Sequence, residues 1–398
     1  MQQDFWPNSK AMFAETREGA LARLAEFSRA ASRYSRDRNH VVPGHTNVSR
    51  LSPAIRCRLI SEQEAAQSVL ERYAFSTVEK FLQEIYWRRY WKEWLAMRPQ
   101  VWTEYLLDVE RLQKGEDYER AWNVSEGRGP IAVMNDFAHE LRETGYLHNH
   151  ARMWFAAYWI HTLRLPWQLG ANFFYRHLLD ADPASNTLSW RWVGGLQTIG
   201  KSYLARRSNI EKYLHPDLLK NDGLELLEKP MALHFEGVSR PEVITSVHAH
   251  TPIDPKRKTA LWLHEEDLSV ETWLAPESLS KVERVIISKP PSNASPVKKA
   301  WLEKAMNDGA SRWNLPVSFT EEVLPVLEKY QISQVMTARP EIGPLNDEMP
   351  TMRASLEEKD VSLHFLERQE DQFQKGLSKS GFFSFWKKIE THVRSLKK

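Results

Sequence analysis

The chain has 398 residues and a formal net charge of +2, and 42% of its residues are hydrophobic and 27% charged. Length and composition are typical of a globular protein with about two or three domains. The small net charge excludes a global basic field of the kind that attracts nucleic acids, although a local basic surface is compatible with it. Cys57 is the only cysteine. This excludes an intramolecular disulfide and a cysteine-ligated iron–sulfur cluster, and it favours a reducing, cytoplasmic location.

Neither secretion nor membrane insertion is expected. The first residues lack the basic region and the apolar run of a signal peptide. The longest apolar stretch, residues 153–167, contains His161, Arg164 and Pro166. We therefore expect a buried helix there and no membrane span.

The first part of the chain, residues 1–228, is helical in pattern. Ser76 and Glu79 have the spacing of a capping box and predict a helix that continues through Trp94. A second helix is predicted over 147–165, and Pro166 is expected to end it. No strand with alternating hydrophobicity is predicted in this part.

The second part has a different pattern. Residues 229–257 are polar and proline-rich, and we expect a linker. Within 258–370, strands are predicted at 259–264, 285–288, 316–319, 334–337 and 361–366, and helices at 296–308, 321–330 and 347–359. Strands that alternate with helices predict a parallel sheet and an α/β domain. Residues 371–398 form a basic C-terminal segment.

The predicted helix through Trp94 carries Glu84, Trp87 and Arg88 at spacings of three and four, so the three side chains share one face. A carboxylate, an indole and a guanidinium suit a pocket for a planar, polar ligand. The alternative is an ion pair between Glu84 and Arg88 beside a packed tryptophan, which is the commoner arrangement on solvated helices.

Asn149, Arg152 and Met153 share a face of the next predicted helix. Asp180 and Asp182 follow, and Arg152 can pair with Asp180, since a buried charge is tolerated when it has a partner. The alternative for the two acids is a solvated turn. The histidines at 148 and 150 lack a third ligand at a suitable spacing, so we expect no metal site.

In chain order, several motifs resemble the FAD-binding domain of the photolyase/cryptochrome family over about residues 10–215. These motifs are Tyr34–Arg38, Ser49-Arg50-Leu51-Ser52-Pro53, Glu84–Arg88, Tyr146-Leu147-His148-Asn149 with Arg152-Met153, Leu179-Asp180-Ala181-Asp182, and Trp190-Arg191-Trp192. The resemblance implies an all-helical photolyase-type FAD-binding domain, followed here by a parallel-sheet, Rossmann-like α/β domain.

The resemblance implies FAD as the cofactor and gives roles to individual residues. The FAD phosphates would lie against the clamp of Tyr34, Ser49, Arg50, Leu51 and Ser52. The flavin would be surrounded by Arg88, Asn149, Arg152, Asp180, Asp182 and Asn186, with Asn186 facing its N5 atom. Asparagine at this position resembles photolyases, whereas plant-type cryptochromes carry an acid. An amide is neutral at every working pH and does not repel a reduced, anionic flavin.

The same resemblance implies catalytic and substrate-binding residues. Trp190 and Trp167 match the two inner members of a tryptophan electron chain. The pocket for a pyrimidine dimer would be formed by Glu84, Trp87, Met153 and Trp192. The chain departs from the family at the outer tryptophan, where Leu112 stands, although two tryptophans, at 102 and 122, lie nearby in the sequence.

The implied function is FAD-dependent, light-driven repair of cyclobutane pyrimidine dimers, with damaged DNA as the partner. The alternatives are a cryptochrome-like photoreceptor that signals through a protein partner, and a flavoprotein that has lost repair and acts through a partner. Because the family's α/β domain normally precedes its helical domain, we interpret the chain as a circular permutation. The alternative is an unrelated parallel-sheet domain, since α/β patterns recur in many folds. No glycine-rich phosphate fingerprint follows residues 259–264, so no dinucleotide is expected there, and the sequence identifies no antenna chromophore.

Overall fold

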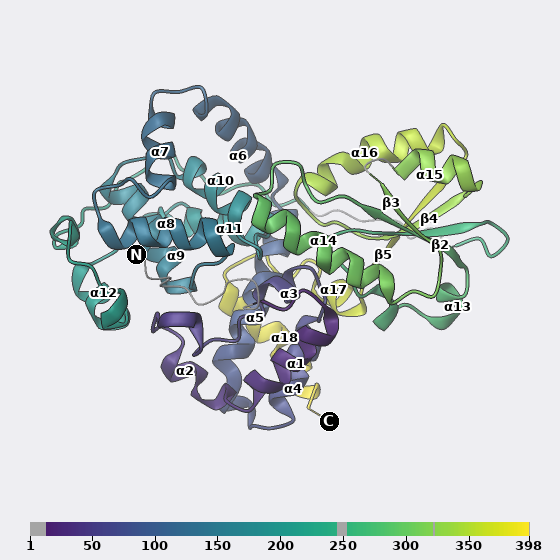
Figure 1. Ribbon diagram of the computed structural model, residues 1–398, viewed down its shortest axis with the longest axis horizontal. Helices are drawn as coiled ribbons and strands as arrows, with labels where there is room; N and C mark the ends of the chain where they lie inside the picture. The colour runs from purple at the N-terminus through teal and green to yellow at the C-terminus, as the bar shows by residue number, and fades with distance from the viewer. Residues whose placement is uncertain (1–12, 245–252, 321–322, 398) are drawn as a thin grey trace, which may run out of the picture.

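The structure is a computed structural model that describes residues 13–244, 253–320 and 323–397. It consists of a helical part and an α/β part that lie side by side (Figure 1). The helical part contains α1 (Arg17–Ser28), α2 (Tyr34–Asp37), α3 (Ser52–Arg56), α4 (Glu62–Leu70), α5 (Phe75–Ala96), α6 (Pro99–Leu112), α7 (Asp117–Ser125), α8 (Ala132–Thr144), α9 (Asn149–Ala157), α10 (Trp167–His177), α11 (Pro183–Val193) and α12 (Arg207–Tyr213). Among the described residues before 228, no strand is formed, as predicted.

The long predicted helix exists, but its predicted start is wrong. α5 begins at Phe75, and Ala74 precedes it in an extended conformation without a side-chain cap. Ser76 therefore lies within the first turn, two residues beyond the N-cap position. The capping box of this region instead opens α4, where the Ser61 hydroxyl accepts from the Glu64 N–H and Glu64 accepts from the Ser61 N–H.

The second predicted helix is confirmed as α9 and a π-helical turn over Tyr158–Thr162. The chain turns before Pro166, whose ring cannot continue a helix, and α10 begins at the next residue. This turn places α10 and α11 beside α9.

The α/β part is built on five strands, all parallel, in the order β3-β2-β1-β4-β5. They are β1 (Thr259–Leu263), β2 (Val282–Ser288), β3 (Val317–Thr320), β4 (Gln334–Ala338) and β5 (Ser362–Leu366). All five predicted strands are confirmed within a few residues. The intervening helices are α13 (Pro276–Leu279), α14 (Pro296–Ser311), α15 (Val323–Tyr330) and α16 (Pro344–Glu357), and the predicted residues 321 and 322 lie outside the described ones.

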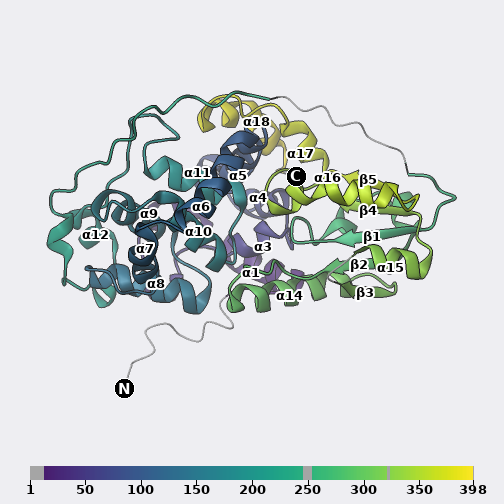
Figure 2. The same cartoon turned by 90° about the horizontal axis from the view of Figure 1, so that it is seen from above.

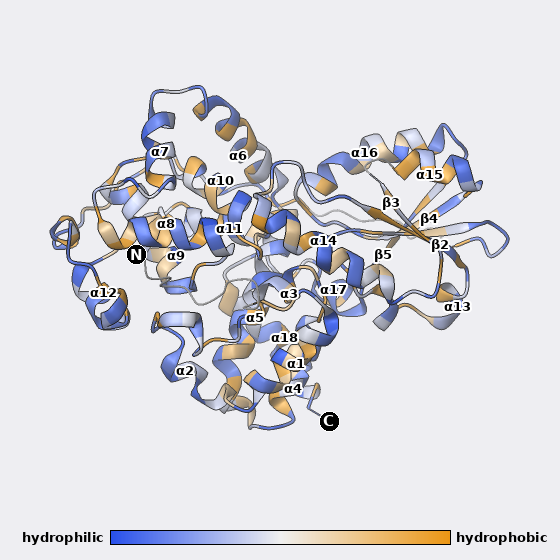
Figure 3. Cartoon of the chain, in the orientation of Figure 1, coloured by the Kyte–Doolittle hydropathy of each residue, from blue (hydrophilic) through white to orange (hydrophobic). Residues whose placement is uncertain are grey.

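Side-chain alternation along β1 explains how the sheet is covered on both faces. Ala260 and Trp262 belong to a hydrophobic cluster with residues of α15 and α16. Leu261 and Leu263 point to the other face and share a cluster with residues of α14 and the helical part. The strands are correspondingly hydrophobic along their length, as a doubly covered parallel sheet requires (Figure 3).

The C-terminal segment folds back onto the helical part. After α17 (Gln369–Gln374), α18 (Phe382–Ser395) lies along α5 in both views (Figures 1 and 2). Its apolar face is buried, and Lys387 and Lys388 of the predicted basic segment are exposed. Residues from both ends of the described chain therefore build the helical body.

The predicted linker follows the surface of the helical part. The Leu233 N–H donates to His161 Nδ1 at 3.0 Å, and the Ile244 N–H donates to the Met97 carbonyl at 2.8 Å. Residues 245–252 of this linker lie outside the described residues. None of the helices in the described part of the chain has both the length and the apolar character needed to cross a membrane.

Candidate functional site

Two adjoining cavities of about 250 and 390 Å³ lie in the helical part, among α2, α5, α9, α11 and the loop before α3. They are parts of one site, because many residues line both: Arg38, Glu84, Arg88, Asn149, Arg152, Asp180, Asp182 and Ser185. Such a combined site is large enough for a cofactor-sized ligand.

Nearly all of the site residues predicted from the sequence line these cavities. The smaller cavity contains the predicted clamp residues, and the larger one the predicted substrate residues; together they account for Tyr34, Ser49, Arg50, Ser52, Glu84, Trp87, Arg88, Asn149, Arg152, Met153, Asp180, Asp182, Asn186, Trp190 and Trp192. One cofactor-binding prediction differs, because Leu51 is fully buried and lines neither cavity. Trp167, predicted as a member of the electron chain, is buried and also lies outside both cavities.

Leu51 supports the clamp loop from behind. Its N–H donates to the Ser49 Oγ at 3.3 Å, and its side chain is part of the core. Arg50, between Ser49 and Leu51, has a φ of 57°, which is unusual for a residue with a Cβ. Residues held in this conformation cluster at ligand sites, where the surrounding structure offsets their strain. The turn directs Arg50 and the two serines of the loop into the smaller cavity.

Arg152 and Asp180 form a bidentate ion pair, with both nitrogen–oxygen distances at 2.9 Å. The Arg152 Nε also donates to the Leu147 carbonyl at 2.7 Å, and its guanidinium lies over the Tyr146 ring. This confirms the pairing predicted from the sequence. It holds α9 against the loop that leads into α11.

Asp182 is the N-cap of α11, where its carboxylate accepts from the Ala184 and Ser185 N–H groups at 3.1 and 2.9 Å. Its second oxygen lies 3.2 Å from Lys92 Nζ and 3.9 Å from each of Arg56 and Arg88. Burial alone raises the pKa of Asp182, but these three cations outweigh burial and hold the pKa well below its usual range. The carboxylate therefore stays charged at the edge of the cavity.

The cations around Asp182 are shared with the α/β part. Lys92 also forms an ion pair with Glu266, and Arg56 lies 2.8 Å from Glu266 and 3.2 Å from Glu265, two residues of the loop after β1. Burial raises the pKa of Glu266, but Arg56 and Lys92 lower it to about 2. The flavin-facing carboxylate predicted from the sequence is thus linked through buried charges to the neighbouring domain.

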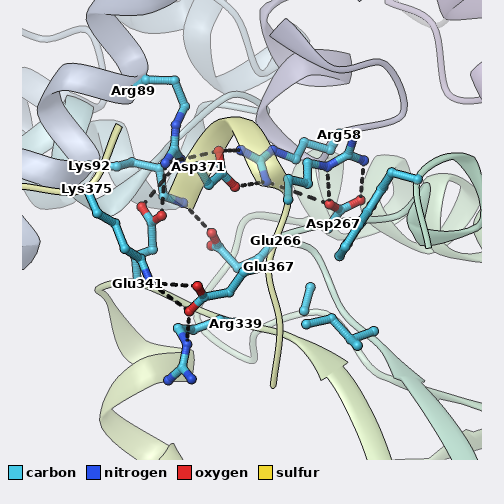
Figure 4. Close-up of a pocket in the computed structure, with 14 residues that line it drawn as sticks. Arg58, Arg89, Lys92, Glu266, Asp267, Arg339, Glu341, Glu367, Asp371 and Lys375 are labelled. Carbon is cyan, nitrogen blue, oxygen red and sulfur yellow. Dashed lines mark hydrogen bonds and ion pairs between the residues drawn. The ribbon is translucent and has the colours of Figure 1, made fainter. Parts of the chain in front are cut away.

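The same interface contains a second set of buried pairs next to Glu266 (Figure 4). Arg58 donates to Asp371 at 2.6 and 2.7 Å, and Arg89 lies 2.9 Å from Glu341 and 3.1 Å from Asp371. In the structure, Arg89 is a domain-interface residue that points away from the predicted substrate pocket.

The larger cavity has an aromatic wall and a carboxylate. Trp87, Met153 and Trp192 line it from three helices, and Trp91, which the sequence analysis did not single out, lies beside Trp87 with ring centroids 5.1 Å apart. Glu84 forms an ion pair with Arg38, not with Arg88. Arg88 pairs with Glu62, so the alternative reading of a simple Glu84–Arg88 pair is wrong.

Several lining residues escaped the sequence analysis. Arg56 and Lys92 are positioned by tertiary contacts, and no spacing in the sequence links them to Asp182. Ser185 follows Asp182 by three residues and is positioned by that N-cap. The available sequence signal for Lys92 was its place on the same predicted helix as Glu84 and Arg88; in the structure it is buried between Asp182 and Glu266.

Unpaired buried atoms indicate that the site is built for a polar ligand. Among the lining residues, Arg50 Nε, His148 Nε2 and Ser185 Oγ are buried without a hydrogen-bond partner. Buried polar atoms normally have one, so these atoms suit a ligand. Guanidinium, hydroxyl and amide donors on one side and carboxylates on the other fit the phosphates and the heterocycle of a flavin nucleotide.

A profile described as the FAD-binding domain of DNA photolyase matches residues 81–215. The helical part of this chain is similar to the FAD-binding domain of the photolyase/cryptochrome family. The matched range contains most of the cavity wall, and FAD is the cofactor that the residues present there fit.

Curated relatives agree with the profile. The deoxyribodipyrimidine photo-lyase of Streptomyces griseus is 30% identical over 217 residues, which are 50% of this chain and 46% of that protein. The enzyme of the same name from Thermus thermophilus is 34% identical over 186 residues, 45% of this chain and 42% of that protein. The chain thus spans less than half the length of the relatives it matches.

Among solved structures, a bacterial class III photolyase from Agrobacterium tumefaciens is similar with a TM-score of 0.43 and 24% identity, over 54% of this chain and 45% of that chain. A Synechocystis cryptochrome is similar with a TM-score of 0.45 and 21% identity, over 54% of this chain and 48% of that chain.

A separate cavity of about 540 Å³ lies at the carboxyl ends of β1 and β2, lined by Trp262, His264 and Lys289 from the sheet and by Tyr175 and Pro183 from the helical part. β1 and β4 flank the point where the strand order reverses. Ligands of doubly wound sheets bind at such points, so the α/β part has room for a small ligand of its own.

The Arg152–Asp180 pair generates the first prediction. Arg152→Ala leaves Asp180 as a partly buried charge without its partner, which costs roughly 3–5 kcal/mol in buried pairs. We expect the purified variant to contain far less FAD than the wild type, measured as flavin released per protein on denaturation. Asp117→Ala removes an exposed pair with Arg120 and serves as the control. Full flavin content in Arg152→Ala would contradict this assignment.

The domain interface generates a second prediction, on pH. Because the folded-state pKa of Glu266 is about 2, below its ordinary 4.5, its stabilisation is complete above pH 4.5 and is lost as the pH falls toward 2. Glu266→Gln leaves Lys92 and Arg56 without this counter-charge, so we expect a lower melting temperature at pH 7 and a shallower loss of stability on acidification. Glu110→Gln, in an exposed pair with Lys114, changes both little. Identical acid profiles for wild type and Glu266→Gln would refute the prediction.

Proposed function

We propose that this chain repairs cyclobutane pyrimidine dimers in DNA by light-driven electron donation. The observation that carries the proposal is one continuous site, with the residues predicted to hold the FAD phosphates and the flavin at one end and an aromatic wall with a carboxylate at the other. Reduced FAD, when bound and excited, supplies an electron that splits the dimer and then returns. The photo-lyase relatives support the same activity.

The larger cavity suits a pair of flipped-out pyrimidines. Stacked aromatic faces bind bases without regard to sequence, and the lesion must leave the duplex to reach an internal site. Trp87 and Trp192 supply such faces, and Met153 fills the space between polar groups. Trp192 is itself stacked on Tyr203, with centroids 5.7 Å apart, so its ring is held in place before substrate binds.

Glu84 is the hydrogen-bonding group of this wall. Burial raises its pKa, and the ion pair with Arg38 only partly offsets that effect. The carboxyl group therefore takes up a proton more readily than an exposed glutamate does. We infer that it contacts the polar edge of a pyrimidine when the lesion binds.

Asn186 and Trp190 close the inner end of the cavity from α11. The Asn186 Nδ2 donates to the Ala171 carbonyl at 2.8 Å, which fixes the amide against α10. Trp190 is buried and packs edge-on against Phe174 and Trp159. We infer that Asn186 would contact the flavin when it is bound and that Trp190 would be the innermost electron donor.

Aromatic rings continue outward from Trp167. Its ring stacks on Tyr105 with centroids 5.6 Å apart, and Tyr105 lies 5.4 Å from Trp102. The Trp102 indole N–H donates to Asp347 of α16 at 2.7 Å. We propose that Trp102, and not the exposed Trp122, takes the place of the outer tryptophan for which Leu112 stands in the sequence.

The alternative function is a photoreceptor, or a repair-inactive flavoprotein, that acts through a protein partner. The net charge of +2 favours it, because DNA binding by other proteins relies on a strong basic surface. The aromatic wall with Glu84 favours repair, since a signalling flavoprotein has no need of a pyrimidine-binding cavity beside the flavin.

We also propose that the two domains stand in permuted order. In the family the α/β domain precedes the helical domain, whereas here β1 to β5 follow it. The packing of α18 on α5 supports this proposal, because the segment after the α/β part returns to the helical body as a preceding segment would.

The aromatic wall generates a prediction on DNA binding. Since stacking of a base on an aromatic side chain is worth roughly 1–3 kcal/mol, Trp87→Ala weakens binding of a dimer-containing oligonucleotide in the dark by about ten- to a hundredfold. Glu84→Gln keeps the shape and lowers repair yield more than affinity. FAD content stays near wild type in Trp87→Ala, because the clamp loop is untouched. If Trp87→Ala instead loses stability but binds the dimer normally, Trp87 is a core residue and the substrate pocket is misassigned.

The buried indoles generate a prediction on photoreduction. Trp190→Phe preserves packing but removes the easily oxidised ring, so FAD is retained and its light-driven reduction by an external thiol slows by at least tenfold. Trp102→Phe slows it less. Trp301→Phe is the matched control, because Trp301 is buried in α14 away from the site. Unchanged photoreduction in Trp190→Phe would show that electrons enter by another route.

A further inference from the structure

The C-terminal helix contacts the predicted substrate pocket directly. Phe382, the first residue of α18, stacks on Trp87 with ring centroids 3.8 Å apart and an interplanar angle of 10°. Phe382 is buried, whereas Trp87 is half-buried and lines the larger cavity. One face of the Trp87 indole is thus covered by a residue that lies 295 positions later in the chain.

We propose that Phe382 is a positioning residue that holds the Trp87 ring in the orientation that binds the lesion. The inference rests on the proposed repair function, because Phe382 is given a role only through Trp87, a residue of the predicted substrate pocket. Phe382 itself touches neither flavin nor DNA in this assignment. It acts through Trp87.

The physical reason is preorganisation. A tryptophan at the rim of a cavity has several rotamers, and the cost of fixing one of them lowers affinity for a ligand that needs it. A parallel stack on one face removes most of this freedom before substrate binds. Trp91 flanks the same indole, with centroids 5.1 Å apart and a tilt of 36°, so the ring is restrained from two directions.

Phe382 is itself fixed by the segment before it. The Tyr90 hydroxyl donates to the Ser380 carbonyl at 2.8 Å, and Arg98 donates to the Lys379 carbonyl at 2.9 Å. Both donors belong to or directly follow α5, the helix that carries Trp87. The stack is therefore built on one rigid element and a loop that is hydrogen-bonded to it.

The docking of α18 does not depend on this stack. Further along the helix, Trp386 stacks near Phe75, Phe385 packs against Tyr90, and the Arg394 guanidinium lies over the Phe75 ring at 3.6 Å. None of these contacts involves Trp87. A change at Phe382 can thus remove the stack and leave the helix in place.

The test compares three phenylalanines of α18 in the full, FAD-loaded chain. Phe382→Leu removes the stacked ring but keeps an apolar side chain. Phe385→Leu is an equally buried change with no ring contact to Trp87, and Phe383→Leu is an exposed one, since Phe383 is 61% exposed. For each variant we measure melting temperature, FAD content and dark affinity for an oligonucleotide with a single thymine dimer. Phe382→Tyr, which restores a ring, is the rescue variant.

A second readout follows Trp87 without any DNA. In protein labelled with 5-fluorotryptophan, the Trp87 fluorine resonance is assigned by its loss in Trp87→Phe. We expect this resonance to broaden or split in Phe382→Leu, as the ring samples other orientations, and to remain a single line in Phe385→Leu. A single, sharp Trp87 line in Phe382→Leu would overturn the positioning role, whatever the protein does with DNA.

The affinity measurements test whether the Phe382–Trp87 stack contributes to binding of the lesion. We expect Phe382→Leu to bind the dimer roughly two- to tenfold more weakly, the range that one aromatic pair supports. FAD content should be unchanged, Phe382→Tyr should recover binding, and Phe382→Leu should have no further effect in a Trp87→Ala background. If the wild type prefers the dimer and Phe382→Leu binds it equally well despite a broadened resonance, the inference is wrong. If the wild type shows no preference for the dimer, the proposed repair function is wrong. The positioning role of Phe382 is then decided by the Trp87 fluorine resonance alone.

Discussion

The Lys92 ammonium, held between Asp182 and Glu266, is the interaction on which the rest of the structure depends. Asp182 caps α11, the helix that carries Asn186, Trp190 and Trp192, so its charge and its position determine one whole side of the cavity. A buried carboxylate among three cations is stable only if the surplus positive charge is balanced. Glu265 and Glu266 supply that balance from the loop after β1. The α/β part is therefore a structural component of the flavin site and not an appendage to it.

The C-terminal segment also packs against the helical part. α18 buries its apolar face on α5 and places Phe382 against Trp87, while the opposite side of α5 directs Arg89 and Lys92 toward the α/β part. α5 thus carries residues of the aromatic wall, of the predicted flavin site and of the domain interface. A helix with three such faces has no simple amphipathic pattern.

Strand positions and most cavity residues could be predicted from the sequence, for different physical reasons. The strands follow from short apolar runs between turn residues, such as Thr259–Leu263, because a doubly covered strand is hydrophobic along its whole length. The cavity residues followed from a resemblance, since the spacing of Glu84, Trp87 and Arg88 alone favoured a surface ion pair. Lys92, Arg56 and Phe382 could not be predicted, because their partners lie 90 to almost 300 positions away, and no local pattern encodes such contacts. Ser76 was misleading because Ser76 and Glu79 have the spacing of a capping box, although Ser76 is already the second residue of α5.

The central claim is that this site uses FAD and light to reverse pyrimidine dimers. The most direct measurement is repair of an oligonucleotide with a single, defined thymine dimer by the reduced, FAD-loaded chain, under blue light and in the dark. The account predicts restoration of intact thymines in the light, none in the dark, and none by protein stripped of flavin. A chain that holds FAD and is photoreduced, but leaves the dimer intact under illumination, would contradict the account and favour a photoreceptor.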